Sequence, residues 1–202
     1  MSFFENTRKP QGFGGKIMLA MMNSGHGAMA EWGFQFLDIP SYASVLDAGC
    51  GGGANIKKLL NKCPDGSVKE IDCSEVSVEK NRKVNAKDIA KGRCEVIQAN
   101  VMELPFEENS FDAVTAFETV FLPDLMLSFR EVYRVLKSGG IFFVCNESSG
   151  ETTKDAKWVE TIGGITIYPG EQLRDVMTAA GFTGIRIEKN HKGWLCVTAQ
   201  KV

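Results

Sequence analysis

The sequence predicts an α/β fold: a Rossmann-like, doubly wound sheet of seven strands, mostly parallel, with helices on both faces. Three observations support this prediction. After residue 43, short apolar runs alternate with helical patterns, the order expected for parallel strands joined by right-handed crossovers. A glycine-rich loop at residues 49–53 directly follows the first apolar run. Only a short polar segment separates the last two strand-like runs, so they should form a hairpin with an antiparallel C-terminal strand.

Hydrophobic periodicity and turn residues place the individual elements. Strands are expected at residues 44–47, 67–72, 94–99, 111–117, 141–145, 182–188 and 194–201. Helices are expected at residues 54–61, 74–90, 122–137 and 171–180. Gly139 and Gly140 would close the third of these helices. The apolar face of helix 74–90 is thin, so we expect much of its surface to be exposed.

The chain of 202 residues is long enough for one substantial domain. We expect this domain at residues 44–202, with a loop insertion at 147–168, after an N-terminal helical lid or extension at residues 1–43. The net charge of −2 gives no reason to expect a nucleic-acid partner. The chain has no apolar run of 18 residues that could span a membrane, and the run 17–22 is too short for a signal peptide. We therefore expect a cytoplasmic protein.

The cysteine and histidine content predicts neither disulfides nor a metal site. Six cysteines are scattered without C-x-x-C spacing, and a chain of this size needs no covalent staples. Two isolated histidines are too few for a zinc site. We expect reduced thiols and no metal.

The stretch V-L-D-A-G-C-G-G-G-A-N at residues 45–55 fits two ligand-binding patterns. As G-x-G-x-x-A it would bind a dinucleotide and make the protein an NAD-dependent oxidoreductase. As G-x-G-x-G after an acid it suits a different ligand, because the Asp47 carboxylate would repel a pyrophosphate but attract an ammonium group. The following helix N-terminus could bind a carboxylate, so an amino-acid group fits both ends. Alternatively, Asp47 only fastens the loop.

Asp72 ends the second predicted strand about twenty residues further on, where a carboxylate can bind both hydroxyls of a ribose. Asp72 could instead cap the helix that follows. Together with the glycine loop, it predicts a ligand with an amino acid at one end and a ribose at the other. S-adenosylmethionine is such a ligand.

Four segments in order resemble the motifs of class I S-adenosylmethionine-dependent methyltransferases. They are V-L-D-A-G-C-G-G-G, V-K-E-I-D-C-S, Q-A-N-V-M-E-L-P-F-E-E-N-S-F-D-A-V and L-K-S-G-G-I-F-F-V, within residues 44–146. The chain most resembles the ubiquinone/menaquinone-biosynthesis methyltransferase-like (methyltransferase type 11) group. The resemblance implies transfer of a methyl group from S-adenosylmethionine, leaving S-adenosylhomocysteine. The methionines and aromatic residues of the N-terminal extension suggest that the acceptor is a small molecule that is apolar or aromatic-bearing.

The resemblance also implies a set of cofactor-binding residues. Asp47 and the backbone of Gly49, Cys50 and Gly51 would hold the methionine end, and Asp72 the ribose. The adenine would lie between Cys73, Asn100 and Val101, and the Phe117 carbonyl would lie near the ligand's amino group. Two positions depart from the family: Asn100 replaces an aspartate, so its amide accepts a weaker, uncharged hydrogen bond, and Cys73 replaces a larger aliphatic residue.

No catalytic residue follows from the cofactor motifs, so the candidates come from other segments. His26, in a glycine-flanked turn, and Glu118, just after the fourth strand, are candidate general bases, and Tyr168 is a third. His26 could instead be a capping or exposed residue, and we expect His191 to be exposed in the hairpin turn. Methionines at 18, 21, 22 and 29 suggest an adaptable lid, or simple packing on the sheet.

Three further possibilities stay open from the sequence. The chain could be a catalytically silent module that binds the cofactor, or a homodimer. An NAD-dependent oxidoreductase would require an apolar residue at position 47, where this chain has aspartate.

Overall fold

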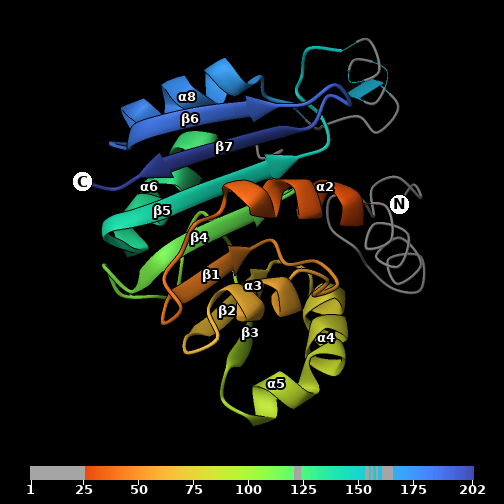
Figure 1. Cartoon of the computed structure of the whole chain (residues 1–202), viewed down its shortest axis with the longest axis vertical. Helices are drawn as coiled ribbons and strands as arrows, with labels where there is room; N and C mark the ends of the chain where they lie inside the picture. Colours follow the sequence, from red (N-terminus) through yellow and green to blue (C-terminus); the bar gives the residue numbers. More distant parts are fainter. Residues whose placement is uncertain (1–25, 121–123, 153–154, 156, 158, 161–165) are drawn as a thin grey trace.

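The computed structural model describes residues 26–120, 124–152, 155, 157, 159–160 and 166–202. It contains one seven-stranded sheet with the order β3-β2-β1-β4-β5-β7-β6 (Figure 1). The strands are β1 Ser44–Ala48, β2 Ser67–Asp72, β3 Cys94–Gln98, β4 Phe111–Phe117, β5 Leu136–Asn146, β6 Thr183–Lys189 and β7 Leu195–Gln200. The pairs from β3 to β5 are parallel, and β7 runs antiparallel to both β5 and β6. This topology confirms the predicted fold class.

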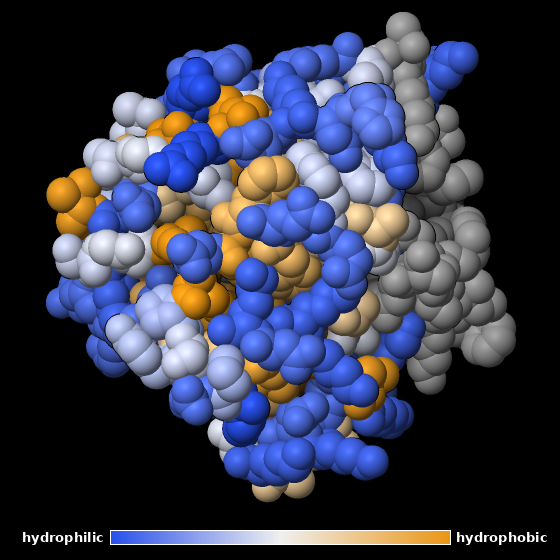
Figure 2. Space-filling model, in the orientation of Figure 1, coloured by the Kyte–Doolittle hydropathy of each residue, from blue (hydrophilic) through white to orange (hydrophobic). Residues whose placement is uncertain are grey.

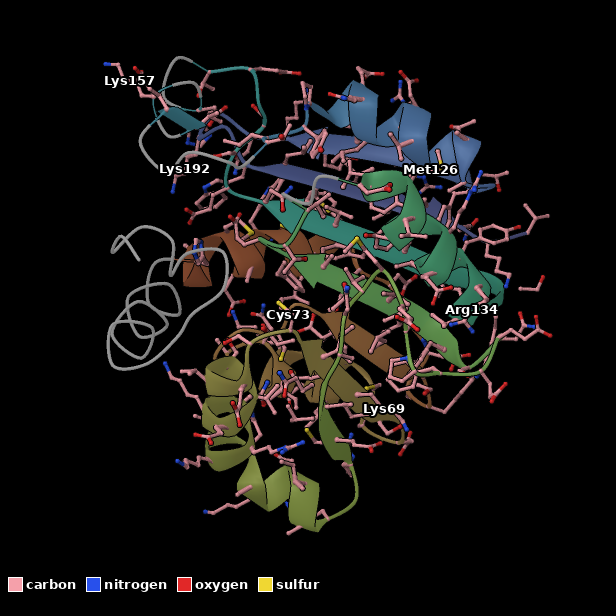
Figure 3. The ribbon with its side chains drawn as sticks, turned by 180° about the vertical axis from the view of Figure 1, so that it is seen from behind. Lys69, Cys73, Met126, Arg134, Lys157 and Lys192 are labelled. Atoms are coloured by element: carbon pink, nitrogen blue, oxygen red, sulfur yellow. The ribbon has the colours of Figure 1, made fainter. Side chains whose placement is uncertain are left out.

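Helices cover both faces of the sheet. Their bounds are α2 Gly27–Gly33, α3 Ile56–Lys62, α4 Glu75–Val84, α5 Ala86–Ala90, α6 Leu125–Val135 and α8 Gly170–Ala179, with a 3-10 turn η2 at Phe34–Phe36. Figure 1 shows α2 and α3 in front of the sheet, and Figure 3 shows α6 and α8 on the opposite face. Side chains alternate along each strand, so the strands contribute apolar residues to both faces of the sheet. One face forms an apolar cluster with α2–α4, and the other forms a cluster with α6 and α8.

Two helix predictions differ from the structure. Helix 74–90 is broken at Asn85 into α4 and α5, and the buried side of α4 is largely polar, with Ser77 and Asn81 fully buried. The prediction that Gly139 and Gly140 close helix 122–137 was wrong. Helix α6 ends at Val135, because Leu136 is fully buried and pairs with Phe111 of β4 as the first residue of β5.

The described part of the N-terminal extension packs on the sheet. Met29 and Ala30 of α2 are buried, and the Met29 sulfur lies 3.0 Å from the Cys145 sulfur of β5. A Cβ at Gly33 would lie only 2.5 Å from that Cys145 sulfur, so glycine permits this close approach. Residues 1–25, with most of the methionines of the predicted lid, lie outside the described residues.

The surface of the face that carries α2 and α3 is mostly hydrophilic, with smaller apolar areas between the charged side chains (Figure 2). Within the described residues, no helix combines the length and apolar character needed to cross a membrane.

Candidate active site

The glycine loop lies at the point where the strand order reverses. β1 has β2 on one side and β4 on the other, so the carboxyl ends of β1 and β4 border the crevice where open α/β sheets bind ligands. Gly49, Gly51 and Gly53 all have positive φ angles, of 81°, 50° and 73°. This backbone favours glycine and brings the chain back beneath the start of α3.

Gly49 needs to be glycine for a second reason. A Cβ there would lie 2.0 Å from the Thr119 methyl carbon. The Thr119 hydroxyl donates a hydrogen bond to the carbonyl of Ala48 at 3.1 Å, and therefore ties the residues after β4 to the glycine loop. The two sides of the crevice are joined at this contact.

Asp72 binds the glycine loop and the start of α4 at once. One carboxylate oxygen accepts from the backbone N–H of Gly51 at 3.0 Å, and the other from that of Ser74 at 2.8 Å. Ser74 is the N-cap of α4, as predicted, and accepts from the N–H of Ser77. Burial raises the pKa of Asp72, and these backbone donors partly offset the rise. Each carboxylate oxygen keeps a further lone pair that could accept a ribose hydroxyl.

Asp47 is a buried carboxylate at the base of the crevice. It is 3% exposed and accepts a hydrogen bond from the Thr115 hydroxyl of β4 at 2.6 Å. Burial raises the pKa of Asp47 to about 6, the Thr115 bond opposes this rise, and the charge of Asp72 adds to it. Asp47 is therefore mainly ionised at neutral pH, in a place where a cation would stabilise it.

The other predicted cofactor residues lie around these groups. Cys73 is exposed just past the carboxyl end of β2 (Figure 3), and the carbonyl of Cys73 accepts from the Gln98 side chain at 3.3 Å. Asn100 is exposed, and its side-chain oxygen accepts from the N–H of Met102 at 3.1 Å. Cys50 and Val101 are partly buried.

Phe117 lies mainly in the apolar layer beneath the crevice. Its ring packs between Phe34 and Phe143, with ring centroids 4.9 and 5.2 Å apart. The side chain of Phe117 therefore has a packing role, while its backbone ends β4 beside the crevice.

His26 and Glu118 meet around a second acid, Glu147. The backbone N–H of Glu147 donates to the Glu118 carboxylate, and the Nδ1 atom of His26 lies 3.4 Å from the Glu147 carboxylate. Glu118 has a φ angle of 55°, a left-handed conformation that is uncommon for a residue other than glycine. Such backbone outliers concentrate at functional sites.

The pKa values of Glu118 and His26 are both raised, for different reasons. Burial raises the pKa of Glu118 to about 7, although nearby His26 and the Glu147 N–H oppose the rise. Burial lowers the pKa of His26, but the Glu147 carboxylate and the charge of Glu118 outweigh it, so the net shift is upward. A carboxyl group that titrates near neutral pH suits proton transfer.

Other residues fall outside this arrangement or were missed. Tyr168 is partly buried against the cluster of α6 and α8, and His191 is exposed in the hairpin turn as predicted. Sequence reasoning missed Glu147, Thr119 and Glu70. Only Glu70 had a local signal, because an acid within a short apolar strand must be buried or paired.

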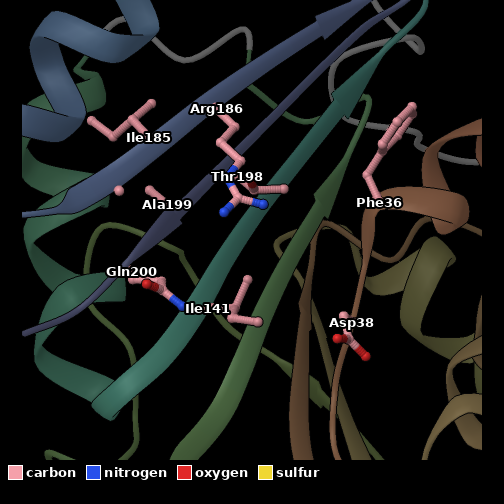
Figure 4. Close-up of a pocket in the computed structure, with 9 residues that line it drawn as sticks. Phe36, Asp38, Ile141, Ile185, Arg186, Thr198, Ala199 and Gln200 are labelled. Atoms are coloured by element: carbon pink, nitrogen blue, oxygen red, sulfur yellow. The ribbon is translucent and has the colours of Figure 1, made fainter.

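A groove of about 440 Å³ lies elsewhere, between η2 and the strands β5, β7 and β6 (Figure 4). Phe36 and Asp38 face Ile141, Arg186 and Gln200 across it. Ile141 pairs with Ala113 near the amino end of β4 and with Gln200 at the carboxyl end of the antiparallel β7, so this groove lies toward the opposite end of the sheet from the glycine loop.

Comparison with known families identifies the class. The family model described as "Methyltransferase domain" matches residues 46–144, which span the glycine loop, Asp72 and the fourth and fifth strands. The match confirms the resemblance seen in the motifs, and these residues form a class I S-adenosylmethionine-dependent methyltransferase domain. Over this domain the chain is similar in sequence to proteins named cycloartenol-C-24-methyltransferase and demethylmenaquinone methyltransferase.

Two relatives illustrate the match. Cycloartenol-C-24-methyltransferase 1 of Oryza sativa subsp. japonica is 37% identical over 101 residues, 50% of this chain and 29% of that protein. Demethylmenaquinone methyltransferase of Lactococcus lactis is 40% identical over 111 residues, 54% of this chain and 43% of that protein. The chain spans less than two thirds of the length of these relatives.

Solved structures share the fold across nearly the whole chain. A putative methyltransferase of Haloferax volcanii, in complex with the Trm112 methyltransferase activator, has a TM-score of 0.81 and 18% identity, covering 91% of this chain and 93% of that one. Geranyl diphosphate C-methyltransferase of Streptomyces coelicolor, with bound S-adenosyl-L-homocysteine, has a TM-score of 0.74 and 16% identity, covering 87% and 76%. At this identity the likeness concerns the fold alone.

Proposed function

We propose that this chain transfers a methyl group from S-adenosylmethionine to an apolar small-molecule acceptor. The observation that carries the proposal is the crevice at the β1/β4 switch point, where three left-handed glycines, Asp47 and Asp72 lie together. A dinucleotide would place its pyrophosphate against the buried Asp47 carboxylate, so the same crevice disfavours NAD.

The residues of the cofactor half fit the two ends of this ligand. Asp47 would bind the ammonium group, and the backbone of Gly49, Cys50 and Gly51 would approach the methionine end without side chains in the way. Asp72 would accept from the ribose hydroxyls with the lone pairs left by its backbone donors. Cys73, Asn100, Val101 and the end of β4 at Phe117 would enclose the adenine and the amino group. When bound, the cofactor supplies a methyl group that its sulfonium has already activated.

The acceptor half supplies proton transfer. Glu118 is the candidate general base, and His26, in ion-pair contact with Glu147, is the candidate to receive or share the proton. The bound cofactor would supply the methyl group with cleavage of its carbon–sulfur bond, and Glu118 would take the proton that the acceptor loses. This role requires ionised Glu118, so the rate should rise as pH increases through about 7.

The names of the relatives support an apolar acceptor. They refer to sterols and to a demethylated menaquinone, both of which carry large apolar groups. The rings of Phe34, Phe117 and Phe143 also pack against one another, and Phe117 ends β4 beside the glycine loop. Closure of the N-terminal extension, residues 1–43, as a lid and assembly into a homodimer stay predictions.

Calorimetric titration with S-adenosylhomocysteine and with NAD tests the cofactor. We expect S-adenosylhomocysteine to bind and NAD not to bind. Binding of NAD without binding of S-adenosylhomocysteine would contradict the proposal. Incubation with methyl-labelled cofactor and a panel of quinol, prenyl and sterol acceptors tests the reaction. We expect the unchanged protein to transfer label to the organic extract. We expect Glu118→Gln to transfer no label although it still binds the cofactor. Labelling of polar acceptors alone would exclude the apolar class.

A further inference from the structure

A buried acid lies directly beneath the glycine loop. Glu70 of β2 is two residues before Asp72, pairs in register with Asp47 of β1, and is 0% exposed. Because side chains alternate, Glu70 points to the same face of the sheet as Val68, toward α3 and α4. One oxygen of Glu70 accepts from the Asn81 side-chain amide. The other is buried without a hydrogen-bond partner among the described residues.

Two asparagines of the α4 segment connect Glu70 to the loop. The Asn81 side-chain oxygen accepts from the Asn85 amide at 2.9 Å, and the same Asn85 nitrogen lies 3.4 Å from the Gly53 carbonyl oxygen. Asn81 and Asn85 are 0% and 2% exposed. A Cβ at Gly53 would lie 2.5 Å from the Asn85 nitrogen, so the last glycine of the loop rests directly on these amides.

We propose that Glu70, Asn81 and Asn85 are positioning residues that hold the glycine loop in its cofactor-binding conformation, and that Glu70 carries a proton which leaves Asp47 as the charged partner of the cofactor's ammonium group. The proposal rests on the proposed function for the identity of the ligand. Two buried carboxyl groups at facing strand positions cannot both ionise without a large desolvation and repulsion cost. One must stay protonated, and the surroundings decide which.

The groups around Glu70 favour the protonated form there. Asp47, Cys50, Asp72 and Cys94 approach it from β1, the loop, β2 and β3, and none of them brings a positive charge. The groups on α4 that touch it are neutral amides. Burial raises the pKa of Glu70 well above its usual range, the charge of Asp47 raises it further, and the hydrogen bond from the Asn81 amide offsets only part of this rise.

Compared with those of Glu70, the surroundings of Asp47 favour the charged form of its carboxyl group. The Thr115 hydroxyl donates to Asp47, which stabilises the carboxylate, and the pKa of Asp47 is only raised to about 6. At neutral pH the proton of this pair therefore belongs on Glu70.

Calorimetric titration with S-adenosylhomocysteine at pH 7.5 tests the proposal, with thermal unfolding to confirm that each variant is folded. Glu70→Gln should bind within about threefold of the unchanged protein, because a neutral amide can still accept from Asn81. Glu70→Leu and Asn85→Ala remove the support and should bind at least about tenfold more weakly. Glu79→Leu on the exposed side of α4 and Asn61→Ala on α3 are matched controls and should leave affinity unchanged.

A pH series separates positioning from a purely structural role. Affinity should fall by roughly tenfold per pH unit below about 6 as Asp47 takes up a proton, and Glu70→Gln should keep this dependence. Folded Glu70→Leu and Asn85→Ala that bind normally would overturn the positioning role. A tenfold change in affinity for Glu70→Gln at pH 7.5 would overturn the proton assignment. If the unchanged protein binds no S-adenosylhomocysteine, the proposed function fails first, and the proposal fails with it.

Discussion

The two sides of the crevice are built in different ways. On the cofactor side, Asp47, the glycine loop and Asp72 come from two short segments and hold one another mainly through backbone N–H groups. On the acceptor side, His26, Glu118 and Glu147 come from three separate segments and meet only through side chains and one backbone N–H. A loop that binds a ligand through its backbone needs glycines at a fixed spacing, and this spacing can be recognised in the sequence. Side chains that meet only in the folded chain leave no local pattern.

The largest expected effect is on the acceptor side. Glu118→Gln should lower the rate of methyl transfer by about 10²–10⁴-fold, the usual contribution of a general base. The affinity for S-adenosylhomocysteine should stay within about threefold, because within the described residues the hydrogen bonds of Glu118 go to Glu147 and Cys145 and not to the glycine loop. The rate of the unchanged protein should rise with pH through about 7, and the variant should lose this rise. A variant with normal rate would separate Glu118 from catalysis.

Stability offers a control that needs no substrate. Because burial raises the pKa of Glu118 from 4.5 to about 7, the folded protein keeps a proton that the unfolded chain has released in this range. Its contribution to the free energy of unfolding therefore falls as pH rises from about 4.5 to 7. Glu118→Gln should show a shallower decline in melting temperature over this window. An identical slope would mean that Glu118 titrates normally.

On the cofactor side, Gly49→Ala should have the next largest effect. The residue combines a φ angle of 81° with a Cβ position 2.0 Å from the Thr119 methyl, so the substitution adds strain and an overlap. We expect a loss of about 2–4 kcal/mol in stability and of most cofactor affinity. Gly92→Ala is the matched control, because Gly92 has a φ angle of 70° but open space around its Cβ. Equal losses in both variants would assign the whole effect to backbone strain.

Asp72→Ala should weaken S-adenosylhomocysteine binding by about 2–3 kcal/mol, the contribution of a charged hydrogen-bond acceptor. Some stability should be lost as well, since the N–H groups of Gly51 and Ser74 lose their acceptor. Asp175→Ala on the exposed side of α8 is a suitable control. If calorimetry gives unchanged affinity in a folded variant, Asp72 only fastens the loop.

Most of the fold could be predicted because it follows from local patterns. Strands β2 and β4 begin and end at the predicted residues, since turn residues and alternating burial mark both ends. The start of β5 could not be predicted, because Leu136 joins the sheet through its pairing with Phe111, a contact between residues far apart in the sequence. The helical spacing of the preceding apolar residues continued through Leu136 and concealed this boundary.

The site divides in the same way. Asp47, the glycines and Asp72 could be placed from spacing and from the resemblance, and the structure brings them together. Glu147 could not be found, because nothing in its neighbourhood distinguishes it until β5 and β4 lie side by side. From the sequence, helix 74–90 was predicted to have a thin apolar face and an exposed polar surface. Its asparagines are buried against the glycine loop, a role that the helical period alone cannot reveal.

The smallest expected effect concerns the link between His26 and Glu147. Glu147→Gln removes a negative charge beside the imidazole, so the pKa of His26 should fall, while its burial remains. The chain has only two histidines, so NMR titration of the imidazole signals can follow His26 with His191 as the internal reference. Glu118→Gln should lower the same pKa, because the Glu118 charge also raises it. If neither variant changes the pKa of His26, the two carboxylates do not interact electrostatically with the imidazole. Glu118 would then be the only candidate for proton transfer on the acceptor side.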